Sequence, residues 1–277
     1  MMRHETGFLA AQRVRARGEL GVAVKAGRTR LARLFQEGGA RIRMPATARD
    51  PLEAVLINTA GGLTGGDRLD WTVDIEDGAS AVVTTQACEK AYRASEGLAE
   101  VGCRMSVAQG GWLAWLPQET ILFDGCAFRR TIEVDLAANA RALIVEATVF
   151  GRQAMGERVT RASVKDRWRI RRDGRLIHAE DFAAGPEIDR MLGAPAGLGG
   201  ATAIATVLYL SEDAEWRLDS ARGIIGQAGG ASFWRVGGSG KLLARIVADD
   251  GYSLRRRLVP LIGLLNGQAG LPKVWTL

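Results

Sequence analysis

The stretch Leu69–Glu76, with the sequence LDWTVDIE, decides the fold class because its residues alternate strictly between apolar and polar. Every second residue from Leu69 to Ile75 is apolar, and the residues between them are acidic or hydroxylated. This period of two predicts a strand with one buried face. The segment DGAS (77–80) then predicts a turn, and AVVTTQ (81–86) predicts the next strand.

The same rhythm continues along the chain. Short apolar or alternating segments are separated by the turn-forming groups QGG, FDG and AAN, and Asp173-Gly174 is a strong hairpin signal. Residues 20–182 are therefore predicted to be almost entirely β. This rhythm suits a sandwich, a barrel or a solenoid of strands. The segments are EVGCRMSVA (100–108), GWLAWLP (111–117), FRRTIEVDL (128–136), RALIVEATVF (141–150) and SVKDRWRIRRDGRLIHAEDF (163–182).

The pattern changes at about residue 183. A connection rich in glycine and proline follows, with a short helix predicted over Glu187–Leu192. Strands are predicted over 202–210 and 242–249, and a helix over 213–227. A second helix over 252–268 is predicted to be interrupted at Pro260, which lacks a backbone donor. No boundary is visible, so we expect one domain (1–277), with a mixed α/β part (183–277) packed on a β-rich body (20–182).

Composition excludes several classes of protein. The 277 residues are 47% hydrophobic and 25% charged, with a net charge of +6. No basic-aromatic module accompanies this charge, so nucleic acid is not expected as a partner. The three cysteines lack CxxC spacing, which argues against a disulfide framework and structural zinc. No leader or membrane-spanning run is evident, so we expect a cytoplasmic protein.

The glycine-rich segment NTAGGLTGGD (58–67) raises the question of phosphate binding. It lacks the lysine and hydroxyl of a P-loop and ends in an acid, Asp67. The later segment VGGSGKLLAR (236–245) has Arg235 where the first P-loop glycine belongs and Leu242 where Ser or Thr is required. We therefore interpret the first segment as a turn between two strands, not a phosphate cradle, that delivers Asp67 to a place where a hydrated cation can meet it.

Two kinds of chemistry remain open from the residues alone. A β-rich hydrolase could use Cys88 with His178 as its base, together with carboxylates. Alternatively, the carboxylates Asp67, Glu146 and Glu180 stand at unusual positions, Glu146 within the apolar run ALIVEATVF. They are either exposed or paired with arginines, or they line a wet internal path, since buried carboxylates need water, a cation or a partner. Clustered His or Cys ligands for a tight transition-metal site are missing.

Several segments in order resemble one family, that of the urease accessory protein UreD, also called UreH. They are NTAGGLTGGDRL, TTQACEKAYR, LAWLPQETILFDGCAF and FGRQAMGE, followed by the C-terminal LPKVW. The resemblance covers residues 20–277 and is densest over 56–182. Cys88, Glu89, Cys126 and Lys273 depart from the usual family pattern.

The resemblance implies a fold and a function. The expected fold is a mainly β, solenoid-like (β-helical) body with a few helices in the C-terminal third. The expected function is non-enzymatic: a urease maturation chaperone that binds apo-urease and the accessory protein UreF, which carries the GTPase UreG. A homodimer of the accessory complex is one arrangement that the resemblance allows. Nickel is expected in transit rather than as a tightly bound cofactor.

The resemblance also assigns residues. Asp67, Glu146 and Glu180 match the acidic positions of an internal nickel path. Arg152 and Glu157 could form an ion pair. The remaining polar motif residues could form either a buried network or a partner-binding face, and they are Thr84, Thr85, Gln86, Lys90, Tyr92 and Arg93.

Overall fold

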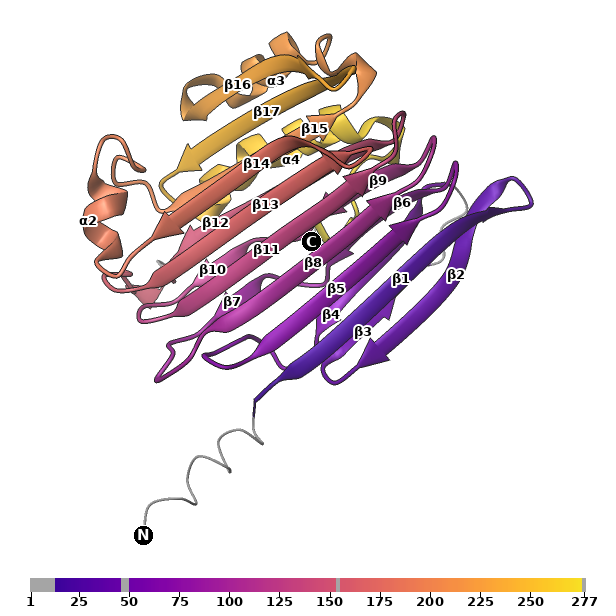
Figure 1. Cartoon of the computed structure of the whole chain (residues 1–277). Coiled ribbons are helices and arrows are strands. Elements are labelled where there is room, and N and C mark those ends of the chain that lie inside the picture. Colours follow the sequence, from indigo (N-terminus) through magenta and orange to yellow (C-terminus); the bar gives the residue numbers. More distant parts are fainter. Residues whose placement is uncertain (1–12, 46–49, 153–154, 276–277) are drawn as a thin grey trace.

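The alternating stretch at Leu69–Glu76 lies at the centre of one of two stacked β-sheets. The structure, a computed structural model, describes residues 13–45, 50–152 and 155–275. Both sheets run the length of the molecule, one behind the other (Figure 1). The front sheet has seven strands, in the order β14 (Arg175–Ala184), β13 (Ser163–Arg172), β11 (Ala127–Leu136), β8 (Ala99–Val107), β5 (Arg68–Ile75), β1 (Arg15–Lys25) and β2 (Arg28–Glu37).

The back sheet has ten strands. Its main path is β16 (Gly229–Val236), β17 (Ser239–Ala248), β15 (Ala203–Leu210), β12 (Arg141–Phe150), β9 (Trp112–Leu116), β6 (Ser80–Thr85), β4 (Leu52–Asn58) and β3 (Ala40–Arg43). Off this path, β10 (Thr120–Leu122) pairs with β12 and with β7 (Glu89–Ala91).

The chain winds between the two sheets as a solenoid of about four turns. It passes from β5 to β6 and β7, and the next turn repeats this path through β8, β9 and β10. Neighbouring turns pair in parallel and in register, so Trp71 lies beside Cys103 and Cys103 beside Ile132. Because residues of one parity stack on one face, every turn adds apolar side chains to the same core. The predicted solenoid-like, mainly β fold is confirmed.

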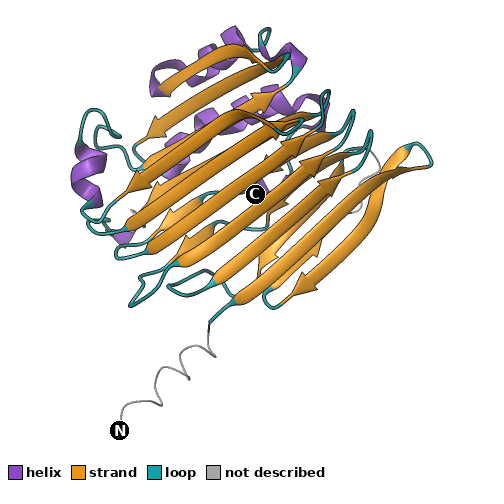
Figure 2. Ribbon diagram, in the orientation of Figure 1, coloured by secondary structure: helices purple, strands orange, loops and turns teal. Residues whose placement is uncertain are grey.

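The C-terminal third adds a helical layer to the back sheet (Figure 2). The helix α4 (Gly251–Asn266) packs on β15 and β17, and α3 (Leu218–Ile225) packs beside it, mainly on β16. The two helices form a second apolar core with these strands. A shorter helix, α2 (Ile188–Gly193), lies in the connection after β14. No helix of the described residues is long and apolar enough to span a bilayer.

Two local expectations are corrected. Helix α4 is continuous through Pro260, which is exposed on its surface, so the missing donor does not end the helix. Asp250 caps the start of this helix by accepting a hydrogen bond of 2.6 Å from the Ser253 N–H.

The strand β16 was not predicted, because its glycines obscure the alternation. The hairpin at Asp173-Gly174 is confirmed, with φ of 47° and 76°.

Candidate functional site: a buried carboxylate–arginine cluster

Glu146 lies in the interior between the two sheets. It belongs to the inward face of β12, and only 5% of the residue is exposed. One carboxylate oxygen accepts a hydrogen bond of 2.9 Å from the indole Nε1 of Trp115, on the neighbouring strand β9. The other oxygen forms an ion pair with the guanidinium of Arg130. Glu146 is therefore a buried, fully engaged carboxylate.

Arg130 joins two carboxylates across the interior. It lies on β11, directly beside Asp166 of β13 in the parallel register, and its Nε is 3.2 Å from Asp166 Oδ1. The same guanidinium donates to Thr120 Oγ1 at 3.2 Å. Trp168 Nε1 donates to Asp166 at 3.0 Å. One cation thus faces two acids, and we call Arg130, Glu146 and Asp166 the buried cluster.

Burial governs the protonation of the buried cluster. It raises the pKa of Glu146 to about 7, although Arg130 opposes this shift. The pKa of Arg130 is raised above its ordinary value, because the two carboxylates outweigh its desolvation. Glu146 can therefore change its charge near neutral pH, while Arg130 stays a cation.

Glu180 lies on the inward face of β14, at the edge of the front sheet. Its carboxylate forms an ion pair with Arg245 of β17, which reaches across from the back sheet. His178 lies on the same strand, with its Nε2 3.9 Å from Glu180 Oε2. Burial lowers the pKa of His178 to about 4, so this imidazole is neutral at ordinary pH.

Two small cavities meet at the buried cluster. The first, of about 30 Å³, is lined by the whole buried cluster together with Glu180 and Arg245. The second, of about 40 Å³, is lined by Arg130 and Glu146 and extends to Glu89. Each has a volume that would hold about two or three water molecules, and the charged groups of each stand among mainly apolar side chains. The Arg130–Glu146 pair borders both cavities.

Asp67 lies apart from these cavities. It is buried, and both carboxylate oxygens accept backbone hydrogen bonds of 2.8 Å, one from Val14 and the other from Thr64. Asp67 therefore ties the start of β1 to the glycine-rich loop. The loop itself joins β4 to β5, as predicted, and Gly61, Gly62 and Gly66 adopt positive φ. Among the predicted site residues, the structure brings together Glu146 and Glu180.

Another polar site, separate from the buried cluster and from Asp67, involves helix α4. Arg255 of this helix forms a bidentate pair with Glu119, with contacts of 2.6 and 2.7 Å. Cys88 Sγ lies 3.4 Å from Glu119, and burial raises the pKa of this thiol to about 11. His178 contacts a different set of residues beside Glu180 and Trp168. The hydrolase alternative is therefore not supported: its thiol stays protonated and has a carboxylate, not the histidine, as its neighbour.

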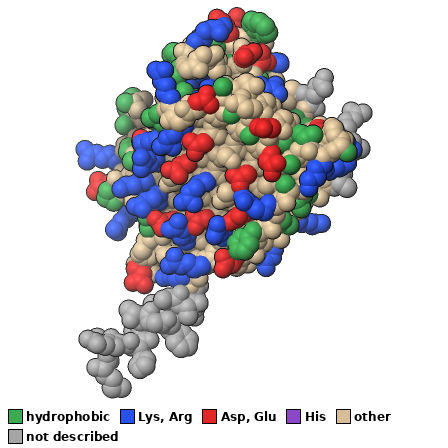
Figure 3. Space-filling model, turned by 45° about the vertical axis from the view of Figure 1, so that its right-hand side comes forward, with side chains coloured by type: hydrophobic (Ala, Val, Ile, Leu, Met, Phe, Trp, Pro, Cys, Tyr) green, Lys and Arg blue, Asp and Glu red, His purple; other side chains and the backbone are tan. Residues whose placement is uncertain are grey.

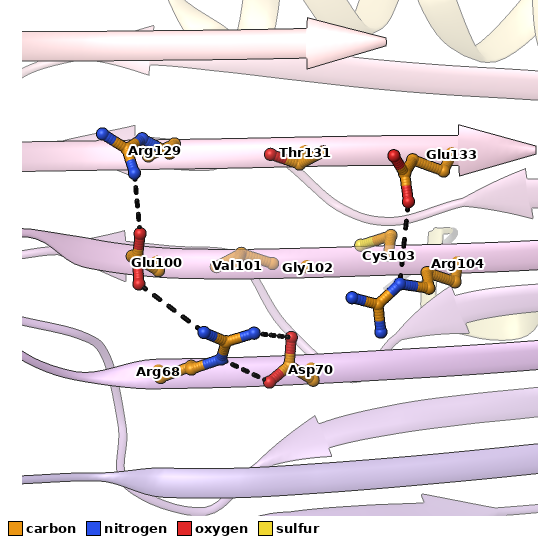
Figure 4. A pocket seen from close by; sticks show the side chains of 10 residues that line it. All are labelled: Arg68, Asp70, Glu100, Val101, Gly102, Cys103, Arg104, Arg129, Thr131 and Glu133. Atoms are coloured by element: carbon orange, nitrogen blue, oxygen red, sulfur yellow. Dashed lines mark hydrogen bonds and ion pairs between the residues drawn. The ribbon is translucent and has the colours of Figure 1, made fainter. Parts of the chain in front are cut away.

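The outer face of the front sheet carries mixed charges (Figure 3). One depression on this face, of about 190 Å³, lies over Gly102, where a Cβ atom would approach Asp70 Oδ1 to 2.4 Å. The side chains around it pair with one another. Arg129 of β11 pairs with Glu100 of the neighbouring strand β8 at 2.9 Å, and Arg68 pairs with Asp70 on the same strand at 2.7 Å (Figure 4). These charges are satisfied and exposed, so this depression is a weaker candidate than the interior.

Sequence reasoning missed three interior residues: Arg130, Asp166 and Glu89. The first two share a signal that was available, since each stands at an inward position among apolar residues of an alternating strand. The predicted Arg152–Glu157 ion pair is present, with a distance of 2.8 Å. Within the described residues, no group of three or more His, Cys, Asp or Glu side chains is arranged to hold a metal ion.

The fold and the interior define a class: a β-solenoid whose two sheets enclose a carboxylate–arginine cluster that borders two small cavities. Comparison with known proteins is more specific. Residues 14–276 match the family model described as UreD urease accessory protein. A urease accessory protein UreD of Mesorhizobium japonicum is 61% identical over 267 residues, covering 96% of this chain and 95% of that protein. The chain belongs to the UreD urease accessory protein family.

Other relatives agree with this assignment. A urease accessory protein UreD 1 of Brucella ovis is 58% identical over 269 residues, 97% of this chain and 96% of that protein. A protein of the same name in Brucella anthropi is 56% identical over 272 residues, with the same coverage of both chains. These relatives are named as accessory proteins.

Proposed function

We propose that this protein is a urease maturation chaperone that conducts nickel through its interior towards the urease active site. The observation that carries the proposal is the line of acidic side chains between the sheets. Glu180, Asp166 and Glu146 border one cavity, and Glu146 and Glu89 border the next. Carboxylate oxygens and water bind a divalent ion without the tight chelation that clustered His or Cys ligands would give.

The pairing of these acids supports transit rather than storage. Arg245 pairs with Glu180, and Arg130 pairs with both Glu146 and Asp166. A divalent cation that binds one of these carboxylates has to displace its arginine, because the metal ion and the guanidinium group repel each other. Each arginine then competes with the bound ion and favours its release. The Arg130–Glu146 pair has to open for an ion to pass between the cavities.

The partners follow from the family. We propose that the chain binds apo-urease and UreF, and through UreF the GTPase UreG, so that it holds the accessory complex on urease. In this proposal the chain turns over no substrate of its own, and it works in the cytoplasm beside its partners.

The test measures nickel per urease active site after co-expression with urease, UreF and UreG under limiting nickel. We would compare the wild type with Glu146→Gln, Glu180→Gln and their double variant. The matched control is Glu133→Gln, because Glu133 is an exposed glutamate of the outer face, on β11. Complex formation is measured by pull-down in parallel. Asp67 is tested separately as Asp67→Asn, because both its oxygens hold backbone groups.

We expect intact complexes and nickel-poor urease for the double variant, with normal loading for Glu133→Gln. The substitutions remove negative charge from the cavities while keeping the shape of the side chains. Full nickel loading with intact complexes would refute the conduction and leave a scaffold. Loss of the complexes would place these residues in assembly instead.

A further inference from the structure

Strand β2 forms one edge of the front sheet, at the right of Figure 1. It pairs with β1, and no strand of the described residues pairs with its other edge. Its last eight residues, Arg30–Glu37, are all exposed. Three of them are large and apolar, with Leu31, Leu34 and Phe35 exposed by 36%, 39% and 41%. A long, partly apolar free edge is a template for further strand pairing, which proteins ordinarily block.

The two faces of β2 are set by its pairing with β1. A β-bulge between Gly21 and Val22 leaves Ala32 as the extra residue of β2. As a result Leu31 and Leu34 both lie opposite buried residues of β1 and face inward. In a regular strand, residues three apart would face opposite sides. On the outer face, Phe35 lies under the guanidinium of Arg17, 5.5 Å from its ring centroid.

This arrangement makes β2 complementary to itself. In an antiparallel pairing of two copies, one register sets Leu31 opposite Leu34, Arg30 opposite Phe35 and Arg28 opposite Glu37. The two residues of each pair lie on the same face of the joined sheet. Leucine therefore faces leucine on the inner face, and on the outer face Arg28 faces Glu37 and Arg30 faces Phe35. A register shifted by two residues in one direction would set arginines opposite one another. A shift by two in the other direction would set leucine opposite glutamine.

We propose that β2 pairs with β2 of a second copy of this chain, joining two front sheets into one continuous sheet about a twofold axis. The contact is isologous, as a twofold interface requires. Arg28 and Glu37, at opposite ends of the strand, have no ion-pair partner among the described residues. The pairing supplies one to each, twice per dimer. This inference concerns a surface outside the interior path and does not depend on nickel conduction.

The first experiment measures self-association of the full chain by sedimentation velocity over a range of concentrations. We compare the wild type with Arg28→Glu, with the double swap Arg28→Glu plus Glu37→Arg, and with the control Arg175→Glu. Arg175 is an exposed arginine of β14, at the opposite edge of the sheet. Arg28→Glu should weaken the dimer about tenfold, since two exposed ion pairs become repulsive. The double swap should restore it, and the control should have no effect.

The second experiment tests the register by cysteine cross-linking. Leu31→Cys and Leu34→Cys are prepared separately, oxidised alone and oxidised after mixing. In the proposed register each new cysteine faces a leucine in its own homodimer, and the two cysteines face each other in the mixed dimer. A disulfide-linked dimer should form on mixing and in neither single sample.

Several results would overturn the inference. A wild type that is still monomeric at about 100 µM would exclude a useful dimer. A dimer that is indifferent to Arg28→Glu, or that cross-links in the single samples, would place the contact elsewhere. If the wild type is monomeric and Arg28→Glu instead reduces pull-down of UreF, the edge serves that protein and not a second copy.

Discussion

At the scale of single residues, the interior depends on one arginine. Arg130 is 4% exposed and forms ion pairs with two acids, Glu146 and Asp166. A buried charge of this kind is costly unless it is paired, and removing one partner leaves the other uncompensated. The indole of Trp115 donates to the second oxygen of Glu146, and the indole of Trp168 donates to Asp166 Oδ1, which also accepts from Arg130. The site is therefore pre-organised, and its acids are held in position by strands on both sheets.

The raised pKa of Glu146 predicts a pH dependence of stability. The pKa is about 7 in the folded protein and about 4.3 in an unfolded chain, so folding favours the protonated form. Its contribution to stability is fully present below the unfolded pKa and is lost as pH rises through about 7. The difference in unfolding free energy, wild type minus Glu146→Gln, should therefore fall between pH 5 and pH 8 in denaturant titrations.

His178 has the opposite effect, because its pKa is lowered to about 4 in the folded state. Its contribution is lost as pH falls from its unfolded value, about 6.5, through about 4. Both proteins in the comparison retain His178, so the difference between them isolates Glu146. The control is Glu133→Gln on the hydrated outer face, which should give a flat difference. A flat difference for Glu146→Gln as well would show that its carboxylate titrates normally.

The sequence identified Glu146 because it interrupts an apolar run, and Glu180 because it stands at the end of the segment LIHAEDF; the family resemblance then matched both to acidic positions. It did not identify Arg130 or Asp166, since an arginine or aspartate inside an alternating strand is ordinarily assigned to the exposed face. Which face is buried depends on the register between turns 29 to 36 residues apart. The sequence also identified Asp67 as a site residue at the end of the glycine-rich turn. The sequence pattern could not predict that its carboxylate binds backbone N–H groups.

At the scale of elements, strands with strict alternation were predicted closely, and β5 begins and ends within one residue of its expected bounds. Elements whose residues go against the usual helix or strand preferences were not predicted correctly. The helix α4 continues past Pro260 because apolar residues such as Leu258 and Leu261 bury its inner face. Strand β16 has two glycines at its start and gains its order from pairing with β17. In both elements tertiary packing outweighs local preference.

The glycine-rich loop makes a prediction about its individual glycines. A Cβ at Gly65 would lie 1.9 Å from the Glu96 carbonyl oxygen, so backbone must move. Gly61 has a φ of 78° but open space around it. Gly61→Ala should therefore cost about 1 kcal/mol from backbone strain alone. Gly65→Ala should cost clearly more, measured as the shift in denaturant midpoint of each variant against the wild type. Equal losses would mean that the loop relaxes freely.

At the scale of the whole molecule, alternation alone could not choose between a sandwich, a barrel and a solenoid. All three bury one face of each strand, and they differ in which strands pair. Here pairing is parallel within the turns of the solenoid and antiparallel at both of its ends, as between β1 and β2 or β15 and β17. The family resemblance supplied the choice. The expectation that the C-terminal part packs on the β-rich body came from the absence of a visible boundary in the sequence. In the structure, the second apolar core contains residues of both parts.

Trp275 holds the C-terminal part of the chain against the solenoid through contacts with β6 and β9. Its ring is 4% exposed, and its Nε1 lies 3.2 Å from Thr84 Oγ1 and 3.1 Å from the Leu116 carbonyl oxygen. Arg255 of α4 covers the ring at 5.3 Å. Trp275→Ala should lower the unfolding free energy by about 3–5 kcal/mol, because it leaves a large cavity and two unsatisfied polar groups.

Trp216 offers a matched control, because this tryptophan is 84% exposed. Trp216→Ala should change stability by no more than about 0.5 kcal/mol. Limited proteolysis should locate the effect: in Trp275→Ala the segment around α4 should become the first site of cleavage, while the solenoid strands stay protected. Equal losses of stability in the two variants, or cleavage that begins in the solenoid, would contradict this prediction. Either result would mean that α3 and α4 hold the C-terminal layer without Trp275.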